Sequence, residues 1–423
     1  MSELQNISTT VNWRSNLAFI WTSQFLAMIG FGCCMPFIPL MLKKNLHIDD
    51  EHLRGLYMSI YYLASMSSLC VATAVWGMLA DRFGRKIMLL RASYAAALFY
   101  PMLAFAPNFW VLVTIRFVCS FFSGTVNPAQ TLLVSTTPAE KHGFVLGTMS
   151  TAIWSGDVLG YCMGGLMVHF FGYTTAFVTC GVIYFISGLL VHLFVKEDFE
   201  AVRRLVREKK AKNQKRPFKE FATPGVLWLL AMFLLMGISK RIDGPYIAML
   251  VEEVCAQDKA DYYTGIIQAA AAIGGVLSGI YIGKLCDRFK PQLLLVPIIV
   301  IATGATLLQA SSKNPWMLIF ARFLTFFASG GFQPALQLMM TKITSSEMRG
   351  TFFGWSQSLH TAGGIVCSLL GGAITYYLNI RGIFVTGAII TFLMLPLLLP
   401  TSRACEKELV ESVKDFSQRP KVV

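Results

Sequence analysis

Long apolar runs separated by short polar stretches dominate this chain. A helix that crosses a membrane needs about 20 mainly apolar residues. Twelve runs of about this length cover residues 16–42, 56–80, 87–106, 109–135, 144–168, 173–195, 224–250, 262–283, 291–311, 315–340, 351–377 and 382–400. Glycine and proline recur inside them, which helices embedded in lipid tolerate. The pattern predicts an all-α membrane protein with twelve transmembrane helices.

Composition agrees with this prediction. Of the 423 residues, 55% are hydrophobic and 14% are charged, whereas about 25% of the residues in a soluble domain are charged. The ten cysteines fall mostly inside apolar runs and form no CxxC pair, so neither a disulfide framework nor a metal site is expected. The first apolar run is too long for a cleavable signal peptide and is expected to remain as a span.

The basic residues indicate how the chain is oriented. If both termini lie on one side, the opposite loops hold only Lys43, Lys44, Arg54, Lys259, Lys313 and Arg381. Cytoplasmic loops carry the excess of lysine and arginine, so both termini are expected to be cytoplasmic. The net charge of +13 is therefore a topology signal, and no nucleic-acid partner is expected. A basic linker at 196–223 is expected to lie on the cytoplasmic membrane face.

Two segments of the chain repeat at a constant offset of 206 residues. RFVCSFFSGTVNPAQTLL at 116–133 matches RFLTFFASGGFQPALQLM at 322–339, and GMLADRFGRK at 77–86 matches GKLCDRFKPQ at 283–292. Parallel repeats of this kind are a known transporter architecture. We therefore expect two pseudo-symmetric six-helix bundles, at 1–195 and 224–423, with a short cytoplasmic tail after the last span.

The segment GMLADRFGRK lies between the second and third predicted spans. In letters and in position it resembles the loop signature of the major facilitator superfamily, and the resemblance covers essentially the whole chain. Arg116 and the glycine-rich segment GDVLGYCMGG at 156–165 resemble the drug:proton antiporter branch and its multidrug exporters. Tyr161 departs from the pattern of that branch, which usually has proline there.

The resemblance implies the major facilitator fold and a cytoplasmic gate. The gate residues that it implies are Gly77, Asp81, Arg82, Gly84, Arg85 and Lys86, with a degenerate second copy at Asp287 and Arg288. The carboxylate of Asp81 can form charge-assisted hydrogen bonds with its basic neighbours or approach a helix N-terminus. In the alternative interpretation, the basic residues only anchor the topology.

Charged residues inside the spans are the main candidates for function. Two acidic residues lie deep in spans, Asp157 and Asp243, and Lys240 and Arg241 precede Asp243. A charge at the bilayer centre costs roughly 2.5–3.5 kcal/mol on insertion scales, so these groups must be paired, hydrated or neutralised. Lys240 and Asp243 are three residues apart and are expected to pair on one helix face. Arg241 then needs another partner, either Asp157 or the substrate.

These charges suggest a site for substrate and protons in a cavity that, by the resemblance, spans one, four, seven and ten would line. An arginine fork suits a carboxylate or phosphate, and burial favours the protonated form of Asp157 or Asp243. The alternative is a purely structural salt-bridge network. Further candidates are Arg116, Asn127, Gln333 and His360. Arg116 and its repeat partner Arg322 can alternatively snorkel toward the membrane surface.

The preferred hypothesis is a proton-coupled secondary transporter of the inner membrane that exports amphipathic organic compounds and functions as a monomer. The alternative is a specific carrier of an anionic or zwitterionic metabolite, such as a carboxylate, an amino acid or a siderophore, in either direction. An intramembrane enzyme is not expected, because the chain has no HExxH or comparable catalytic motif. No P-loop is present, and no cofactor is expected. A transporter-like sensor remains as a third class.

Overall fold

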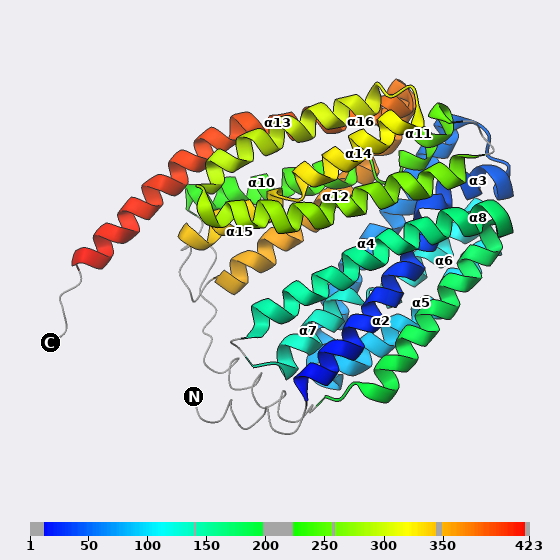
Figure 1. Cartoon of the computed structure of the whole chain (residues 1–423), viewed down its shortest axis with the longest axis horizontal. Helices are drawn as coiled ribbons and strands as arrows, with labels where there is room; N and C mark the ends of the chain where they lie inside the picture. Colours follow the sequence, from blue (N-terminus) through cyan, green and yellow to red (C-terminus); the bar gives the residue numbers. More distant parts are fainter. Residues whose placement is uncertain (1–11, 139–140, 198–222, 256–258, 344–348, 419–423) are drawn as a thin grey trace. The chain divides into compact units, whose positions relative to one another are not determined.

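The computed structural model describes residues 12–138, 141–197, 223–255, 259–343 and 349–418, and within these ranges the regular elements are helices only (Figure 1). Inside the helices, the side chains of Asp81 and Asp287 are outside the described part. In chain order the elements are α2 (Trp13–Cys34), η1 (Met35–Phe37), α3 (Ile38–Leu46), α4 (Glu51–Phe83), α5 (Arg85–Ala104), α6 (Phe109–Phe122), α7 (Val126–Thr136), α8 (His142–Phe194), α10 (Pro224–Arg241), α11 (Ile247–Val254), α12 (Ala260–Arg288), α13 (Pro291–Ala310), α14 (Pro315–Ser329), α15 (Phe332–Ile343) and α16 (Arg349–Gln418).

Ten helical segments within the described residues are long and apolar enough to cross a membrane. Two of them, Phe144–Phe194 and Gly354–Lys407, each hold two spans, because a residue with positive φ interrupts the helix. Gly172 has φ 80° and Asn379 has φ 60°, a region that glycine and asparagine tolerate best. The predicted all-α membrane fold with twelve spans is therefore confirmed.

The chain divides into two compact units. The first comprises Met1–Gln214 and Ile247–Ile273, and the second comprises Lys215–Tyr246 and Gly274–Val423. The segment Ile247–Ile273 follows the predicted linker in sequence but packs with the first unit. The predicted bundle boundaries at 195 and 224 remain a prediction.

The internal repeat extends to the local structure of α6 and α14. The side chain of Asn108 accepts a hydrogen bond from the amide of Val111 (3.0 Å), and that of Asn314 accepts one from Met317 (2.8 Å). Both asparagines are therefore N-caps, which satisfy an otherwise unpaired amide at the helix start. Both helices then break just before their repeat proline, at 123–125 and 330–331.

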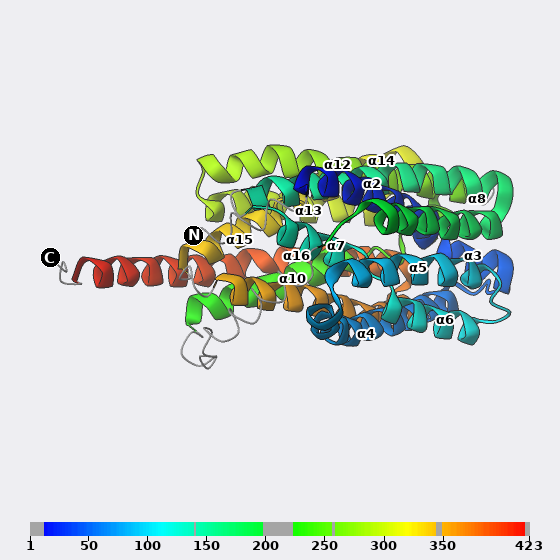
Figure 2. The same ribbon diagram turned by 90° about the horizontal axis from the view of Figure 1, so that it is seen from below.

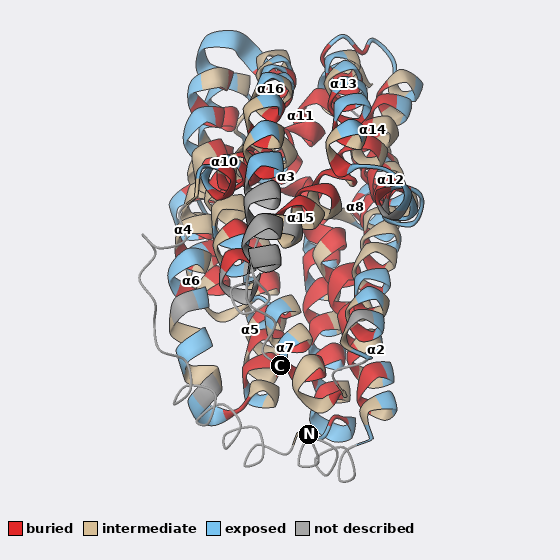
Figure 3. Ribbon diagram, turned by 90° about the vertical axis from the view of Figure 1, so that its left-hand side faces the viewer, coloured by how far each residue is buried: buried red, intermediate tan, exposed pale blue. Residues whose placement is uncertain are grey.

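Large apolar side chains remain exposed on the outer helices, as expected for a surface that faces lipid. Figure 3 shows exposed and buried residues alternating around the same helices. Trp110 and Trp316, which are repeat partners at the starts of α6 and α14, are 63% and 73% exposed. Tryptophan is enriched at membrane–water interfaces, so both positions are consistent with the ends of spans.

Helices α2 and α8 lie side by side in two views (Figures 1 and 2) and approach closely at glycines. A Cβ atom added at Gly156, Gly160 or Gly164 would lie 2.6 Å from a backbone atom of α2. Glycines four residues apart fall on one helix face and let two backbones meet. The close packing expected from GDVLGYCMGG is confirmed.

We expect Gly160→Val to destabilise the protein, whereas Gly147→Val should not. A side chain at Gly160 must displace the backbone of α2, and overpacking of this kind costs about 1–3 kcal/mol. Gly147 lies on the same helix, so the two substitutions change helix propensity equally. An added Cβ at Gly147 has nothing within 4 Å, so only the change at Gly160 causes a clash. The measurement is the thermal midpoint of each purified variant in detergent, determined by size-exclusion chromatography after heating. Equal midpoints would contradict the packing role of Gly160.

Candidate functional site

The second unit contains a buried ion pair between Asp243 and Arg322. Asp243 lies in the break between α10 and α11, Arg322 lies on α14, and the two residues are 4% and 1% exposed. The Nη1 atom of Arg322 donates to Oδ2 of Asp243 and also to Oε1 of Gln309 on α13, at 3.3 Å. The amide of Gln309 donates in turn to Oγ1 of Thr325 at 2.6 Å. Two helices, α13 and α14, together with the break between α10 and α11, thus form one buried polar network.

The expected pairing of Lys240 with Asp243 is wrong, as is the alternative that Arg322 snorkels outward. Residues three apart face each other only on a continuous helix, and α10 ends at Arg241, so Asp243 lies beyond it. Gly244 and Pro245 follow in this break. Lys240 is half-buried and lines a cavity of about 20 Å³ together with Asp243. This volume suffices for about one water molecule.

His360 lies against the same part of α10. A Cβ atom added at Gly237 would clash with the carbonyl oxygen of His360, so the two backbones touch one turn before Lys240. Both ring nitrogens of His360 are buried and have no hydrogen-bond partner among the described residues. Arg241, the last residue of α10, is half-buried. These basic groups therefore gather around one helix end in the second unit.

Arg116 occupies the matching place in the first unit but has different partners. It is 7% exposed on α6, so it does not snorkel outward either. Its Nε atom donates to Oγ of Ser65 at 3.1 Å, and Nη1 donates to the hydroxyl of Tyr100 at 3.5 Å. The guanidinium carbon also lies 5.6 Å from the ring centroid of Tyr61. Among the described residues, these partners are hydroxyls and rings, and none is a carboxylate.

Asp157 is half-buried on α8, next to the glycine contact with α2. Its Oδ1 atom is buried and has no hydrogen-bond partner among the described residues. Arg241, its suggested partner, belongs to the other unit, so that pairing remains a prediction. Gln333 is half-buried on α15. The structure therefore leaves Asp157 as a carboxyl group that a proton can neutralise.

The loop between α4 and α5 contains a carboxylate interaction that the sequence reasoning missed. Gly84 links the two helices with φ 100°, a conformation that favours glycine. The carboxylate of Glu197, just after α8, accepts hydrogen bonds from the amides of Arg85 and Lys86 at 2.9 and 2.8 Å. A carboxylate at a helix N-terminus is stabilising.

The remaining gate residues show no comparable interaction within the described part. The Nζ atom of Lys86 donates to the carbonyl of His192 at 3.0 Å, and Arg82 and Arg288 are exposed. The role proposed for Asp81 and Asp287 concerns side chains outside the described part. The latch at Asp81 therefore stays a prediction.

A second missed cluster lies at the opposite ends of the spans, within the first unit. We call the six residues Lys43, Lys44, Arg54, Tyr173, Glu252 and Asp261 the ionic lock. Glu252 forms ion pairs with Lys43 and, through its Oε2 atom at 2.9 Å, with Nη2 of Arg54.

The other carboxylate of the ionic lock is Asp261. It accepts hydrogen bonds from Nζ of Lys44 at 2.6 Å and from the hydroxyl of Tyr173 at 2.7 Å. Both carboxylates come from the segment Ile247–Ile273, and the side chain of Asp261 is only 2% exposed. This segment is thus tied to the first six spans by charge.

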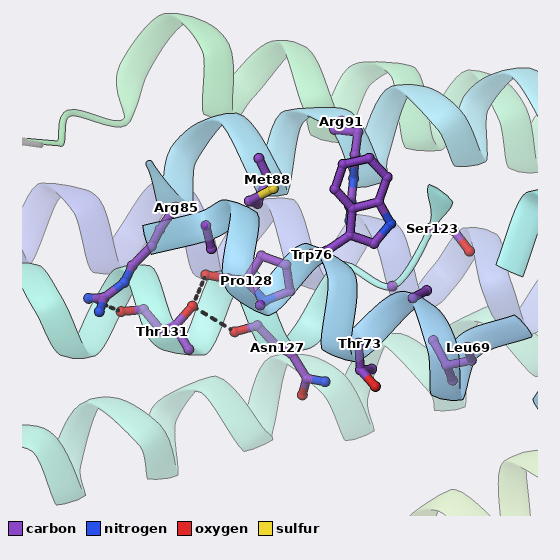
Figure 4. A pocket seen from close by; sticks show the side chains of 14 residues that line it. Leu69, Thr73, Trp76, Arg85, Met88, Arg91, Ser123, Asn127, Pro128 and Thr131 are labelled. Atoms are coloured by element: carbon purple, nitrogen blue, oxygen red, sulfur yellow. Dashed lines mark hydrogen bonds between the residues drawn. The ribbon is translucent and has the colours of Figure 1, made fainter. Parts of the chain in front are cut away.

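Asn127 and Gly77 fall in a different place, a pocket between α4, α5 and α7 of the first unit. Figure 4 shows Asn127 and Thr131 on α7, and Thr73 and Trp76 on the neighbouring α4. Among the predicted site residues, Lys240 and Asp243 line one small cavity of the second unit. Asn127 instead lines the pocket of the first unit.

Comparisons with known proteins place the chain among transporters. The sequence profile of the Major Facilitator Superfamily matches residues 20–254 and, separately, residues 246–420. A "Multi-drug resistance efflux pump PmrA homolog" of Lactococcus lactis is 30% identical over 384 residues, which are 90% of this chain and 93% of that protein. "Multidrug resistance protein MdtG" of Salmonella arizonae is 29% identical over 388 residues, 90% and 94% of the two chains.

Solved structures agree in fold. The nucleoside transporter NupG has a TM-score of 0.73 at 13% identity, with 90% of this chain and 98% of that chain covered. A bacterial homologue of the human lysosomal transporter Spinster has a TM-score of 0.69 at 14% identity, with 93% and 97% covered. The expected resemblance to the multidrug exporter group of MdtG is confirmed.

Proposed function

Because the chain belongs to the Major Facilitator Superfamily and is a multi-pass membrane transporter rather than an enzyme, we propose that it is a proton-coupled exporter of amphipathic organic compounds that works by alternating access. Multidrug efflux relatives at about 30% identity over 90% of the chain support the direction and the substrate class. We place it in the inner membrane as a monomer with both termini in the cytoplasm, and the loop charges support this orientation.

Proton coupling is supported chiefly by the buried pair of Asp243 and Arg322. The guanidinium of Arg322 and a proton compete for the same carboxylate oxygen of Asp243. The cavity that Lys240 and Asp243 share is large enough for a water molecule to carry the proton. Asp157, with an unpartnered buried oxygen, is the second candidate proton site.

Alternating access is supported by the ionic lock. The segment Ile247–Ile273 belongs to the second half by sequence, yet charged contacts hold it to the first unit. In our proposal, transport requires this segment to leave the first unit in one state and return in the other. A set of ion pairs that breaks and reforms is a common element of such two-state transitions.

A carrier specific for an anionic metabolite is the second candidate. Lys240 and Arg241 favour it, because Asp243 pairs with Arg322 and Lys240 has no acidic partner among the described residues. A second unit with more basic than acidic buried groups repels organic cations and attracts anions.

Transport in inside-out vesicles tests the proposal. We expect an imposed gradient, acidic inside, to drive accumulation of a lipophilic cationic dye such as ethidium, and a protonophore to abolish it. Vesicles without the protein are the control. Accumulation of 2-naphthoate alone would favour the anion carrier. If the pH gradient moves neither compound, the proposal of proton-coupled drug export is contradicted.

A further inference from the structure

The first unit contains a pocket of about 200 Å³ that arises from the break in the fourth span. Helix α6 ends at Phe122 and α7 begins at Val126, and Gly124 between them has φ 99°. The backbone thus turns at Gly124, where the pocket opens between α4, α5 and α7. Its lining residues are Leu69, Ala72, Thr73, Trp76, Gly77, Ala80, Arg85, Met88, Arg91, Ser123, Gly124, Asn127, Pro128 and Thr131.

Two arginines give this pocket a positive charge, and none of the lining residues that the structure describes is acidic. Arg85 already donates from Nη1 to the carbonyl of Thr131 at 3.3 Å (Figure 4). Apolar groups, including Leu69 and Met88, line much of the remainder. A small site with apolar walls and a few polar groups that fix orientation is the usual form of a ligand pocket.

Arg91 is the group in this pocket that lacks a partner. Its guanidinium carbon lies 3.8 Å from the ring centroid of Trp76, and the indole nitrogen of Trp76 donates to the carbonyl of Phe121 at 2.7 Å. The ring thus holds the guanidinium in place, as Figure 4 shows. The Nε and Nη1 atoms of Arg91 are buried and have no hydrogen-bond partner among the described residues. An anion would supply the missing acceptors.

The second unit shows that the fold does not require this pocket. At the same offset of 206 residues, Trp76 corresponds to Ile282 and Arg91 corresponds to Pro297. There a Cβ atom at Gly331 would lie 2.6 Å from Ile282 and 3.0 Å from Ile298, so apolar side chains fill the matching space. The aromatic ring and the arginine are therefore specific features of the first unit.

We propose that this pocket binds a small amphipathic organic anion, with its apolar body beside Trp76 and Met88 and its acidic group on Arg91. A guanidinium binds a carboxylate or sulfonate through charge-assisted hydrogen bonds. The volume is below the roughly 300–1,000 Å³ of pockets for drug-sized ligands, so the ligand has one or two rings. The site lies within the first unit, whereas Asp243 and Arg322 belong to the second.

Equilibrium dialysis of radiolabelled 2-naphthoate tests this inference. The full chain is placed in nanodiscs of phosphatidylcholine, and binding to empty nanodiscs is subtracted. We expect saturable binding at one site per chain, and binding about 10- to 100-fold weaker in Arg91→Gln. Arg14→Gln is the matched control, because Arg14 also lies over a tryptophan, Trp13, but is exposed and outside the pocket. The cation 2-naphthylmethylammonium should not compete.

Several outcomes would overturn the inference. These are no saturable binding of 2-naphthoate, equal binding in Arg91→Gln, or equal competition by the cation. Equal thermal midpoints of the wild type and Arg91→Gln ensure that a loss of binding is not a loss of fold. A second set of nanodiscs contains phosphatidylglycerol. Displacement of 2-naphthoate by this lipid identifies a lipid headgroup as the anion, and unchanged binding identifies a soluble anion. Because no transport is measured, failure of the proposed function leaves this result unaffected.

Discussion

Replacing Asp243 with alanine is expected to lower the amount of folded protein sharply. The change leaves the guanidinium of Arg322, which is 1% exposed, without its carboxylate. Breaking a buried pair by removing one partner costs about 3–5 kcal/mol, a large part of the stability of an ordinary domain. The measurement is the thermal midpoint and the monodisperse fraction of the purified variant.

The double variant Asp243→Ala with Arg322→Leu separates stability from function. Replacing both charged partners with apolar groups is often neutral, so the double variant should regain most of the lost stability. We expect it to remain unable to accumulate substrate under a pH gradient, because the proton site is gone. Full transport by the double variant would assign the pair to structure alone.

Asp243→Asn tests the proton role more directly. Asparagine keeps an oxygen that can accept from Arg322 but does not titrate. We expect this variant to exchange substrate down its gradient while it loses more than about 90% of the accumulation that a pH gradient drives. Accumulation equal to that of the wild type would contradict a coupling role for Asp243.

Removing the ionic lock is expected to shift the equilibrium between transport states. Glu252→Gln takes the carboxylate away from both Lys43 and Arg54, and Arg54 is 4% exposed. A hydrogen bond to a charged group contributes about 1.5–3 kcal/mol, so the state without the lock should gain roughly 10- to 100-fold in population. The segment Ile247–Ile273 would then leave the first unit more often.

Spin labels at His47 and Lys259 can report this change. Both positions are exposed; His47 follows Lys43 and Lys44 in the chain, and Lys259 precedes Asp261. In a background without native cysteines, double electron–electron resonance should show a longer distance in Glu252→Gln that is rare in the wild type. Asp49→Asn, an exposed carboxylate outside the lock, is the control. An unchanged distance distribution would show that the lock is not a gate.

A charge swap gives an independent check of the same cluster. Asp261→Lys replaces the carboxylate next to Lys44 with a second cation, and the repulsion should lengthen the distance between the labels. Adding Lys44→Asp restores one pair of opposite charges and should shorten it again. If the swap has no effect, then the packing of Gly165 against Gly265 holds the segment without help from charge.

Residues that are apart in sequence account for most of what the sequence reasoning missed. It treated the seventh span as one helix and paired Lys240 with Asp243, but the helix ends at Arg241 and Asp243 binds Arg322 on α14. It assigned no role to Arg91, which stacks on Trp76 fifteen residues earlier in the chain. Neither partner can be read from spacing along one helix.

The sequence by itself determined the membrane class, the twelve spans, the internal repeat and the superfamily. Each of these follows from local length, hydrophobicity or matching letters, and the lipid environment forces an apolar run of this length to be a helix. Only the tertiary structure decided which charges meet. Partners such as Asp261 and Lys44, or Glu197 and the start of α5, lie on separate segments, and an ion pair depends on distances of a few ångströms that the packing of helices sets.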